Sequence, residues 1–150
     1  MRLWHYKLLQ FLPDAQFKGQ LRELVAIMHD WRDKGKTNHL LINRVMEYPK
    51  EELYHYWVGY RDEWYKRGLR DLSHYDDEFY GFSNGGYWYS ECRIEFPYEA
   101  EWHNKEYLRV CMANLYEKHN FGIGKSRITD EEWQRLCEGY KTITGEDYLI

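Results

Sequence analysis

The sequence predicts a mostly α-helical fold in a compact single domain, and three observations support this. The chain has 150 residues, which is the length of one ordinary domain. Apolar residues recur at spacings of three and four in several segments, which is typical of helices that bury one face. With 43% hydrophobic and 31% charged residues, the composition also supplies a core and argues against a disordered chain.

The first long helix is expected to begin after Pro13, with Asp14 as its N-cap. Gly35 is expected to end it, because glycine accepts the left-handed conformation that commonly closes a helix. Between these bounds the large apolar residues form one stripe at spacings of 4, 3, 4 and 3, made of Phe17, Leu21, Leu24, Met28 and Trp31.

A second, shorter helix is expected from Asn38 to Glu47. Pro49 ends it and starts a third helix. The apolar stripe of this third helix again runs 4, 3, 4, and Gly68 is its expected stop. The stripe consists of Leu53, Trp57, Tyr60 and Trp64.

Residues 71–98 are predicted to form a long aromatic and acidic loop or a small hairpin, because Asn84-Gly85-Gly86 is a turn signal between aromatic flanks. A further helix is expected from about Glu99 to Lys118. The last helix should begin at Thr129, where Glu132 three residues later completes a capping box. We therefore divide the single domain into a helical part (1–70), an aromatic and acidic insertion (71–98) and C-terminal helices (99–150).

Charge is distributed unevenly along the chain. The net charge is −4, but residues 1–70 hold 13 Lys and Arg against 9 Asp and Glu, a balance of +4. The remaining 8 basic and 16 acidic residues give residues 71–150 a balance of −8. A polyanion is therefore expected to meet the first half of the chain, and a protein partner could dock on the acidic second half.

Several functional classes are excluded as first choices. No apolar run approaches the roughly 18 residues that a membrane span needs, and the start of the chain lacks a secretory signal. The three cysteines, Cys92, Cys111 and Cys137, form no CxxC pair, which argues against a disulfide framework or zinc finger. The simplest expectation is a cytoplasmic protein that does not contact membranes.

Metal and phosphate motifs are weak in this sequence. None of the seven histidines forms HxxxH or HExxH with another, and His74 near Asp76 and Asp77 is the nearest thing to a cluster. Gly122-Ile123-Gly124-Lys125-Ser126 lacks the spacing of a phosphate-binding loop and is expected to be a connector between helices. We therefore expect no metal and no cofactor.

The adjacent pair Arg22-Glu23 is the most informative polar feature of the first helix. A cation and a carboxylate at the edge of an apolar stripe are most often solvated or salt-bridged. The functional alternative is a carboxylate in a cleft, with its neighbour binding a phosphate.

A series of short segments then points to a known family. In order they are Met1-Arg2-Leu3-Trp4-His5, Leu12-Pro13, Gly19-Gln20-Leu21-Arg22-Glu23-Leu24, Asn38-His39-Leu40-Leu41-Ile42-Asn43, Tyr48-Pro49 and Lys66-Arg67-Gly68. Over about residues 1–70 the chain resembles the pyrimidine dimer DNA glycosylase family of the endonuclease V type. Residues 71–150 show no such resemblance, and residues 71–98 are the part expected to alter the substrate, toward another modified base or single-stranded DNA.

The resemblance implies a helical, metal-free DNA glycosylase with associated abasic-site lyase activity in DNA repair. In that family the N-terminal α-amine attacks C1′ of a damaged pyrimidine nucleotide and forms an imine, and a glutamate assists. Transferred to this sequence, the amine belongs to Met1, the glutamate is Glu23, and Arg2 and Arg22 bind phosphates. The other expected DNA contacts on the basic first half are Arg32, Lys34, Lys36 and His39.

This chemistry is physically reasonable, and the sequence departs from the family pattern at two positions. An α-amine has an ordinary pKa near 8, so a useful fraction is nucleophilic near neutral pH, and nearby Arg2 and Arg22 are expected to lower that pKa. Arg at position 2 is expected to leave Met1 in place, and Ala26 stands where better-known members carry another arginine.

Two hypotheses follow. In the first, the protein is a glycosylase and lyase that acts through the Met1 amine and Glu23. In the second, it is a non-enzymatic protein- or nucleotide-binding module that keeps the helical scaffold. Glu23 is then salt-bridged, and the acidic second half docks a protein partner. A structure in which the Met1 amine and the Glu23 carboxylate lie close together would favour the enzyme.

Overall fold

A computed structural model describes residues 2–39, 42–84 and 97–150, and this part of the chain contains helices and no strand. The predicted mostly α-helical class is thereby confirmed. The α-helices are α1 (Asp14–Lys34), α2 (Lys50–Lys66), α3 (Ser73–Phe82), α5 (Lys105–Phe121) and α6 (Asp130–Thr144). In the described ranges, three short 3₁₀ helices accompany them, namely η1 (Tyr6–Phe11), η2 (Ile42–Glu47) and η3 (Gly124–Ser126).

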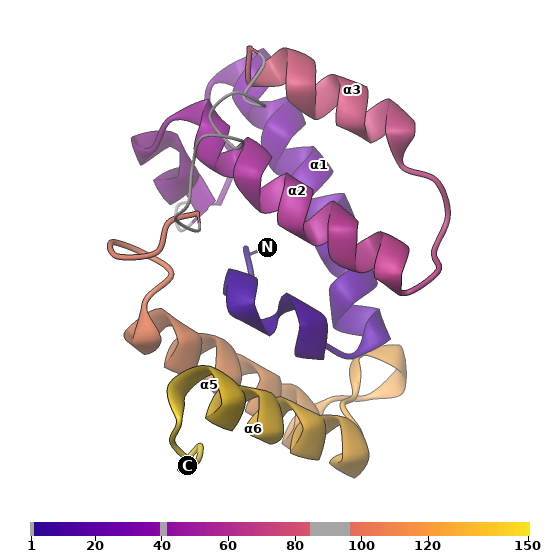
Figure 1. Cartoon of the computed structure of the whole chain (residues 1–150), viewed down its shortest axis with the longest axis vertical. Coiled ribbons are helices and arrows are strands. Elements are labelled where there is room, and N and C mark those ends of the chain that lie inside the picture. Colours follow the sequence, from indigo (N-terminus) through magenta and orange to yellow (C-terminus); the bar gives the residue numbers. More distant parts are fainter. Residues whose placement is uncertain (1, 40–41, 85–96) are drawn as a thin grey trace.

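The N-terminal segment lies in the middle of the molecule. Helices α1, α2 and α3 lie on one side of it, and the antiparallel pair of α5 and α6 lies on the other (Figure 1). Accordingly η1 packs against both α2 and α6, and Leu3, Leu8 and Leu12 are almost fully buried. The start of the chain therefore belongs to the core, where apolar burial from both sides fixes its position.

Helix α1 follows the predicted apolar stripe, and Phe17, Leu24 and Met28 on it are fully buried. Gly35 closes the helix at φ 73°, as predicted. The prediction that Asp14 is the N-cap is wrong, because Pro13 takes that position and Asp14 is the first helical residue. The Asp14 carboxylate instead accepts a hydrogen bond from Arg67 at 2.9 Å.

Helix α3 corrects the prediction of a long non-helical connection over residues 71–98. Tyr75, Phe79 and Phe82 follow a helical spacing, and Phe79 stacks on Trp57 of α2 with ring centroids 4.4 Å apart. Turn-forming residues after Phe82 obscured this pattern in the sequence. Residues 85–96, which include Gly85 and Gly86 of the predicted turn, lie outside the described residues.

Two predicted helix starts are also wrong. The helix expected over 38–47 is a 3₁₀ helix that begins at Ile42 among the described residues. The helix expected from Glu99 begins at Lys105, because residues 98–103 form turns that bury Trp102 and His103. Asn104 then caps α5 by accepting a hydrogen bond from the Tyr107 N–H. The capping box of Thr129 and Glu132 on α6 is confirmed.

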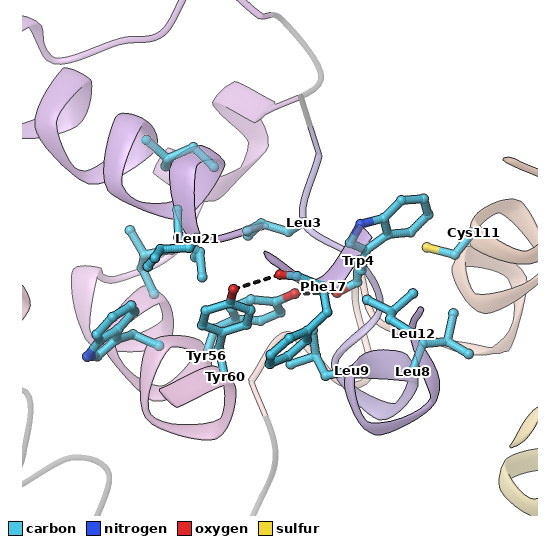
Figure 2. Close-up of a cluster of buried hydrophobic side chains, with 14 of the residues drawn as sticks. Leu3, Trp4, Leu8, Leu9, Leu12, Phe17, Leu21, Tyr56, Tyr60 and Cys111 are labelled. Atoms are coloured by element: carbon cyan, nitrogen blue, oxygen red, sulfur yellow. Dashed lines mark hydrogen bonds between the residues drawn. The ribbon is translucent and has the colours of Figure 1, made fainter. Parts of the chain in front are cut away.

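The buried hydrophobic side chains form one connected cluster that reaches from Leu3 to Tyr140. Figure 2 shows its centre, where Tyr56 and Tyr60 of α2 aim their hydroxyl groups at the backbone of the N-terminal part of the chain. Within the described ranges, no helix combines the length and apolar character that crossing a membrane requires.

Candidate active site

The extended segment from Arg2 to Trp4 is held at its backbone by side chains from three helices. On one edge, Arg2 and Trp4 bond to side chains of α1 and α2. On the other edge, the Leu3 carbonyl accepts a short hydrogen bond from the Tyr107 hydroxyl of α5. The peptide groups that follow Met1 therefore have fixed partners inside the fold.

Gln20 of α1 contacts the segment at both Arg2 and Trp4, and its side chain is fully buried. Its Nε2 donates to the Arg2 carbonyl at 2.8 Å and to Glu23 Oε2 at 3.3 Å. Its Oε1 accepts from the Trp4 N–H at 2.8 Å and from the Tyr56 hydroxyl at 3.3 Å. Gln20 lies three residues after Phe17 and four before Leu24, on the buried face of α1, which the spacing could have indicated, but its partners depend on the tertiary fold.

The two tyrosines that bind the segment are permanent donors. Burial raises the pKa of Tyr56, and burial also raises the pKa of Tyr107, in both cases well above the ordinary value for a phenol. Tyr56 donates to the Trp4 carbonyl at 2.6 Å. Both hydroxyls therefore stay protonated throughout the neutral range and keep the segment in place.

Glu23 lies beside the start of the chain. It follows Gln20 by three residues, so both side chains lie on one face of α1. The half-buried Glu23 carboxylate accepts the Arg2 backbone N–H at 3.2 Å. That nitrogen is the atom through which Arg2 is bonded to Met1, which itself lies outside the described residues. Arg22, adjacent on the helix, is exposed.

Two arginines gather around this end of the segment. The Arg2 guanidinium lies 4.9 Å from the ring centroid of Trp4. Arg44 of η2 lies 5.4 Å from the centroid of Trp102 and donates to the Glu101 carbonyl at 2.7 Å. Both positive charges lower the pKa of Tyr107, opposing the larger effect of its burial. Arg44 is therefore a basic residue near the segment that the sequence alone did not single out.

The remaining predicted DNA contacts lie at and beyond the C-terminal end of α1. Lys34 is 11 residues beyond Glu23, which corresponds to about 17 Å along a helix. Arg32 is paired with Asp33 at 2.8 Å and with Glu78 of α3 at 3.6 Å, and Lys34 is paired with Asp30 at 3.6 Å. Lys36 and His39 are exposed beyond the helix end. The structure therefore separates this second basic group from Glu23.

Two buried histidines form hydrogen bonds to the backbone just after the segment. His5 Nδ1 accepts the Lys7 N–H at 3.2 Å, so its other nitrogen, Nε2, carries the proton and donates to the His103 carbonyl at 2.8 Å. His103 Nδ1 accepts the Tyr6 N–H at 3.1 Å. Burial lowers the pKa of His5 to about 4 and lowers the pKa of His103 well below its ordinary value. Both rings are neutral near pH 7.

Other candidate chemistries receive little support within the described ranges. Burial raises the pKa of the Cys111 thiol to about 11, so it is not a thiolate at neutral pH. Cys92 lies outside the described residues. His, Cys, Asp and Glu side chains in the described ranges form no group of three or more that could hold a metal ion.

A cavity of about 450 Å³ lies between η1 and α2. Its walls include Tyr6, Lys7, His55 and Lys66, and Pro97 lies at its border. None of the predicted site residues lines it. The cavity is therefore separate from the Arg2–Glu23 contact.

Comparison with known proteins gives one match. The sequence model of a family described as pyrimidine dimer DNA glycosylase matches residues 1–77, which extend from the N-terminal segment through α1 and α2 into α3. No curated protein and no solved structure matches. The matched residues contain both Glu23 and the segment that contacts it, and a glycosylase of this type acts on DNA. Because the match covers half of the sequence, the chain belongs to the pyrimidine dimer DNA glycosylase family.

Proposed function

We propose that the protein is a bifunctional DNA glycosylase and abasic-site lyase that uses the α-amine of Met1 as nucleophile and Glu23 as its carboxylate. The observation that carries this proposal is the hydrogen bond from the Arg2 N–H to Glu23 Oε2 at 3.2 Å. The Glu23 carboxylate accepts a hydrogen bond from the first peptide nitrogen, one residue after the proposed nucleophile, and this supports the proposal.

The neutral amine attacks C1′ of a damaged or modified pyrimidine nucleotide, and the base departs with the electrons of the C1′–N bond. Opening of the sugar ring converts the C1′ adduct into a protonated imine. The Glu23 carboxylate stabilises that positive charge and accepts the proton released at C2′. Elimination of the 3′-phosphate then breaks the strand.

Arg2, Arg22 and Arg44 are the proposed phosphate contacts close to the reacting nucleotide. Guanidinium groups suit this role because they stay charged and bind phosphate oxygens in pairs. Lys36 and His39 are proposed to contact the same backbone several nucleotides away, since Lys34 before them already lies about 17 Å along the helix from Glu23 and one nucleotide spans roughly 3.4 Å. Arg32 and Lys34 are proposed to contribute less, since each already neutralises a carboxylate.

The binding-module alternative rests on the acidic second half of the chain. Part of that negative charge is already paired with other groups of the same chain. Asp76 bonds to Arg61 at 3.2 Å and to the Trp57 indole at 2.8 Å, and Glu146 bonds to Lys105 at 2.6 Å. The enzyme is therefore the function we favour.

Glu23→Gln tests the proposal. The amide oxygen can still accept the Arg2 N–H, so we expect an unchanged melting temperature. It carries no negative charge and is a poor base, so we expect strand cleavage at an abasic site to fall by at least about 100-fold. Full cleavage by a variant that melts like the parent protein would remove Glu23 from the mechanism.

A further inference from the structure

The Gln20 amide is hydrogen-bonded at both its nitrogen and its oxygen. One Nε2 hydrogen is directed to the Arg2 carbonyl and the other to Glu23 Oε2, while Oε1 accepts from Trp4 and Tyr56. Its orientation is defined by its backbone partners, since a peptide N–H can only donate and a carbonyl can only accept. An amide that is bonded through both its nitrogen and its oxygen at a fully buried position has one arrangement, so it fixes its partners firmly.

The contacts along the segment alternate as they would in a β-sheet. In an extended chain, the N–H and C=O of one residue point to the same edge, and the next residue points to the opposite edge. Arg2 and Trp4 face α1 and α2, whereas the Leu3 carbonyl faces Tyr107. The Gln20 side chain thus takes the place of a neighbouring strand for the first residues of the chain.

Gln20 also bonds to the proposed catalytic carboxylate. Its Nε2 lies 2.8 Å from the Arg2 carbonyl and 3.3 Å from Glu23 Oε2. One buried –NH₂ group therefore connects the N-terminal segment, which follows the proposed nucleophile, to the carboxylate that assists it. We propose that Gln20 is a positioning residue that sets the Met1 amine and the Glu23 carboxylate in register for imine formation, an inference that rests on the function proposed above.

Gln16 provides a matched control on the same helix. It lies one turn before Gln20, is also buried, and donates from Nε2 to the Ser126 carbonyl at 3.0 Å. It therefore ties α1 to η3, and its Nε2 bonds neither Glu23 nor the N-terminal segment. Gln16→Met and Gln20→Met remove the same amide group from buried positions on the same helix. A difference in reaction rate between the two variants would therefore depend on where each side chain lies relative to the reacting groups.

The experiment measures borohydride trapping on a duplex with one abasic site, with protein in excess over DNA so that a single turnover is observed. Binding to a duplex that carries an uncleavable tetrahydrofuran abasic analogue is measured separately. We expect Gln20→Met to slow adduct formation by about 100-fold, as small misplacements of reacting groups do. Its affinity for the analogue should stay within about threefold of the parent protein, and Gln16→Met should react at the parent rate.

Gln20→Glu supplies a pH signature and serves if Gln20→Met does not fold. At neutral pH its carboxylate cannot donate to the Arg2 carbonyl and repels Glu23, whereas its protonated form can donate one hydrogen bond. Its rate relative to the parent protein should therefore rise as pH falls. A destabilised but correctly positioned site would show no such trend.

The outcomes separate the two claims. If the parent protein forms an adduct and Gln20→Met reacts as fast as Gln16→Met, Gln20 has no positioning role while the proposed function stands. A rate ratio for Gln20→Glu that does not change with pH would likewise exclude the positioning role. If the parent protein forms no adduct with abasic DNA, the proposed function fails, and the role of Gln20 fails with it.

Discussion

Glu23 and Gln20 show which properties of a side chain can be predicted from the sequence and which cannot. Glu23 was identified by its family resemblance, and the structure sets its carboxylate against the first peptide group. Gln20 lies on the buried face of α1, where a polar residue is unusual, yet nothing in the sequence specifies which groups it bonds. Its partners, Arg2, Trp4 and Tyr56, come from two other parts of the chain.

Arg44 gives a residue-scale prediction about DNA binding. Each phosphate that a protein neutralises adds about 0.9 to the slope of log affinity against log salt concentration. We expect Arg44→Ala to weaken binding to duplex DNA at low salt and to reduce that slope by about 0.9. Fluorescence anisotropy across a salt series measures both quantities.

Arg32→Ala is the matched control for Arg44→Ala. Arg32 is also an exposed arginine, but its guanidinium is already engaged by Asp33 and Glu78. We expect a smaller change in slope for Arg32→Ala. Equal changes for the two variants, or a larger change for Arg32→Ala, would contradict our placement of the DNA backbone beside Arg44.

Among the secondary-structure elements, long apolar stripes and cap motifs were predictable and short elements were not. Helices α1, α2 and α6 lie close to where periodicity, proline, glycine and the capping box place them. Helix α3 was missed because its stabilising contact is the stacking of Phe79 on Trp57, which is tertiary. The turn-forming residues that follow Phe82 instead favoured a loop.

The contact between η1 and α6 gives an element-scale prediction. A Cβ added at Gly139 of α6 would lie 2.5 Å from Cγ of Phe11, too close without movement of the ring. We expect Gly139→Ala to lower the free energy of unfolding by about 1–3 kcal/mol, as overpacking does. Urea unfolding measures the change.

Gly59→Ala is the control for the Gly139 substitution. Gly59 is exposed on α2, and a Cβ there meets no atom within 4 Å. We expect it to be neutral or to stabilise the protein by up to about 1 kcal/mol through helix propensity. Equal stabilities for the two variants would show that α6 does not press against η1 as described.

At the scale of the whole molecule, the N-terminal segment is a core element between two groups of helices (Figure 1). The family match ends at residue 77, yet Tyr107 and His103 from beyond it bond to the segment and to the Tyr6 N–H just after it. The second half of the chain therefore contributes to positioning the site. Sequence reasoning could not show this, because no motif in residues 99–150 indicates which part of the chain those residues contact.

The buried histidines predict how the stability of the whole molecule depends on pH. His5 is neutral in the folded protein down to about pH 4, whereas in the unfolded chain it takes up a proton below about pH 6.5. The unfolded state then binds more protons, so stability should be highest above pH 6.5 and fall as pH drops from 6.5 toward 4. Each such histidine steepens the decline by up to about 1.4 kcal/mol per pH unit.

Urea unfolding at a series of pH values measures this dependence. His5→Asn should remove about one proton from the number taken up on unfolding, and so make the decline shallower. His74→Gln, which changes an exposed histidine on α3, should leave the decline unchanged. A His5→Asn protein with the parent slope would mean that His5 is not the buried neutral group described above.

The central claim, imine chemistry at the start of the chain, is tested most directly by borohydride trapping of the untagged protein on DNA with one abasic site. We predict a covalent adduct that forms with the parent protein and is lost when the N-terminal amine is acetylated. Peptide mapping should place the linkage at Met1. A folded, unblocked protein that forms no adduct, or an adduct that survives acetylation, would contradict the mechanism.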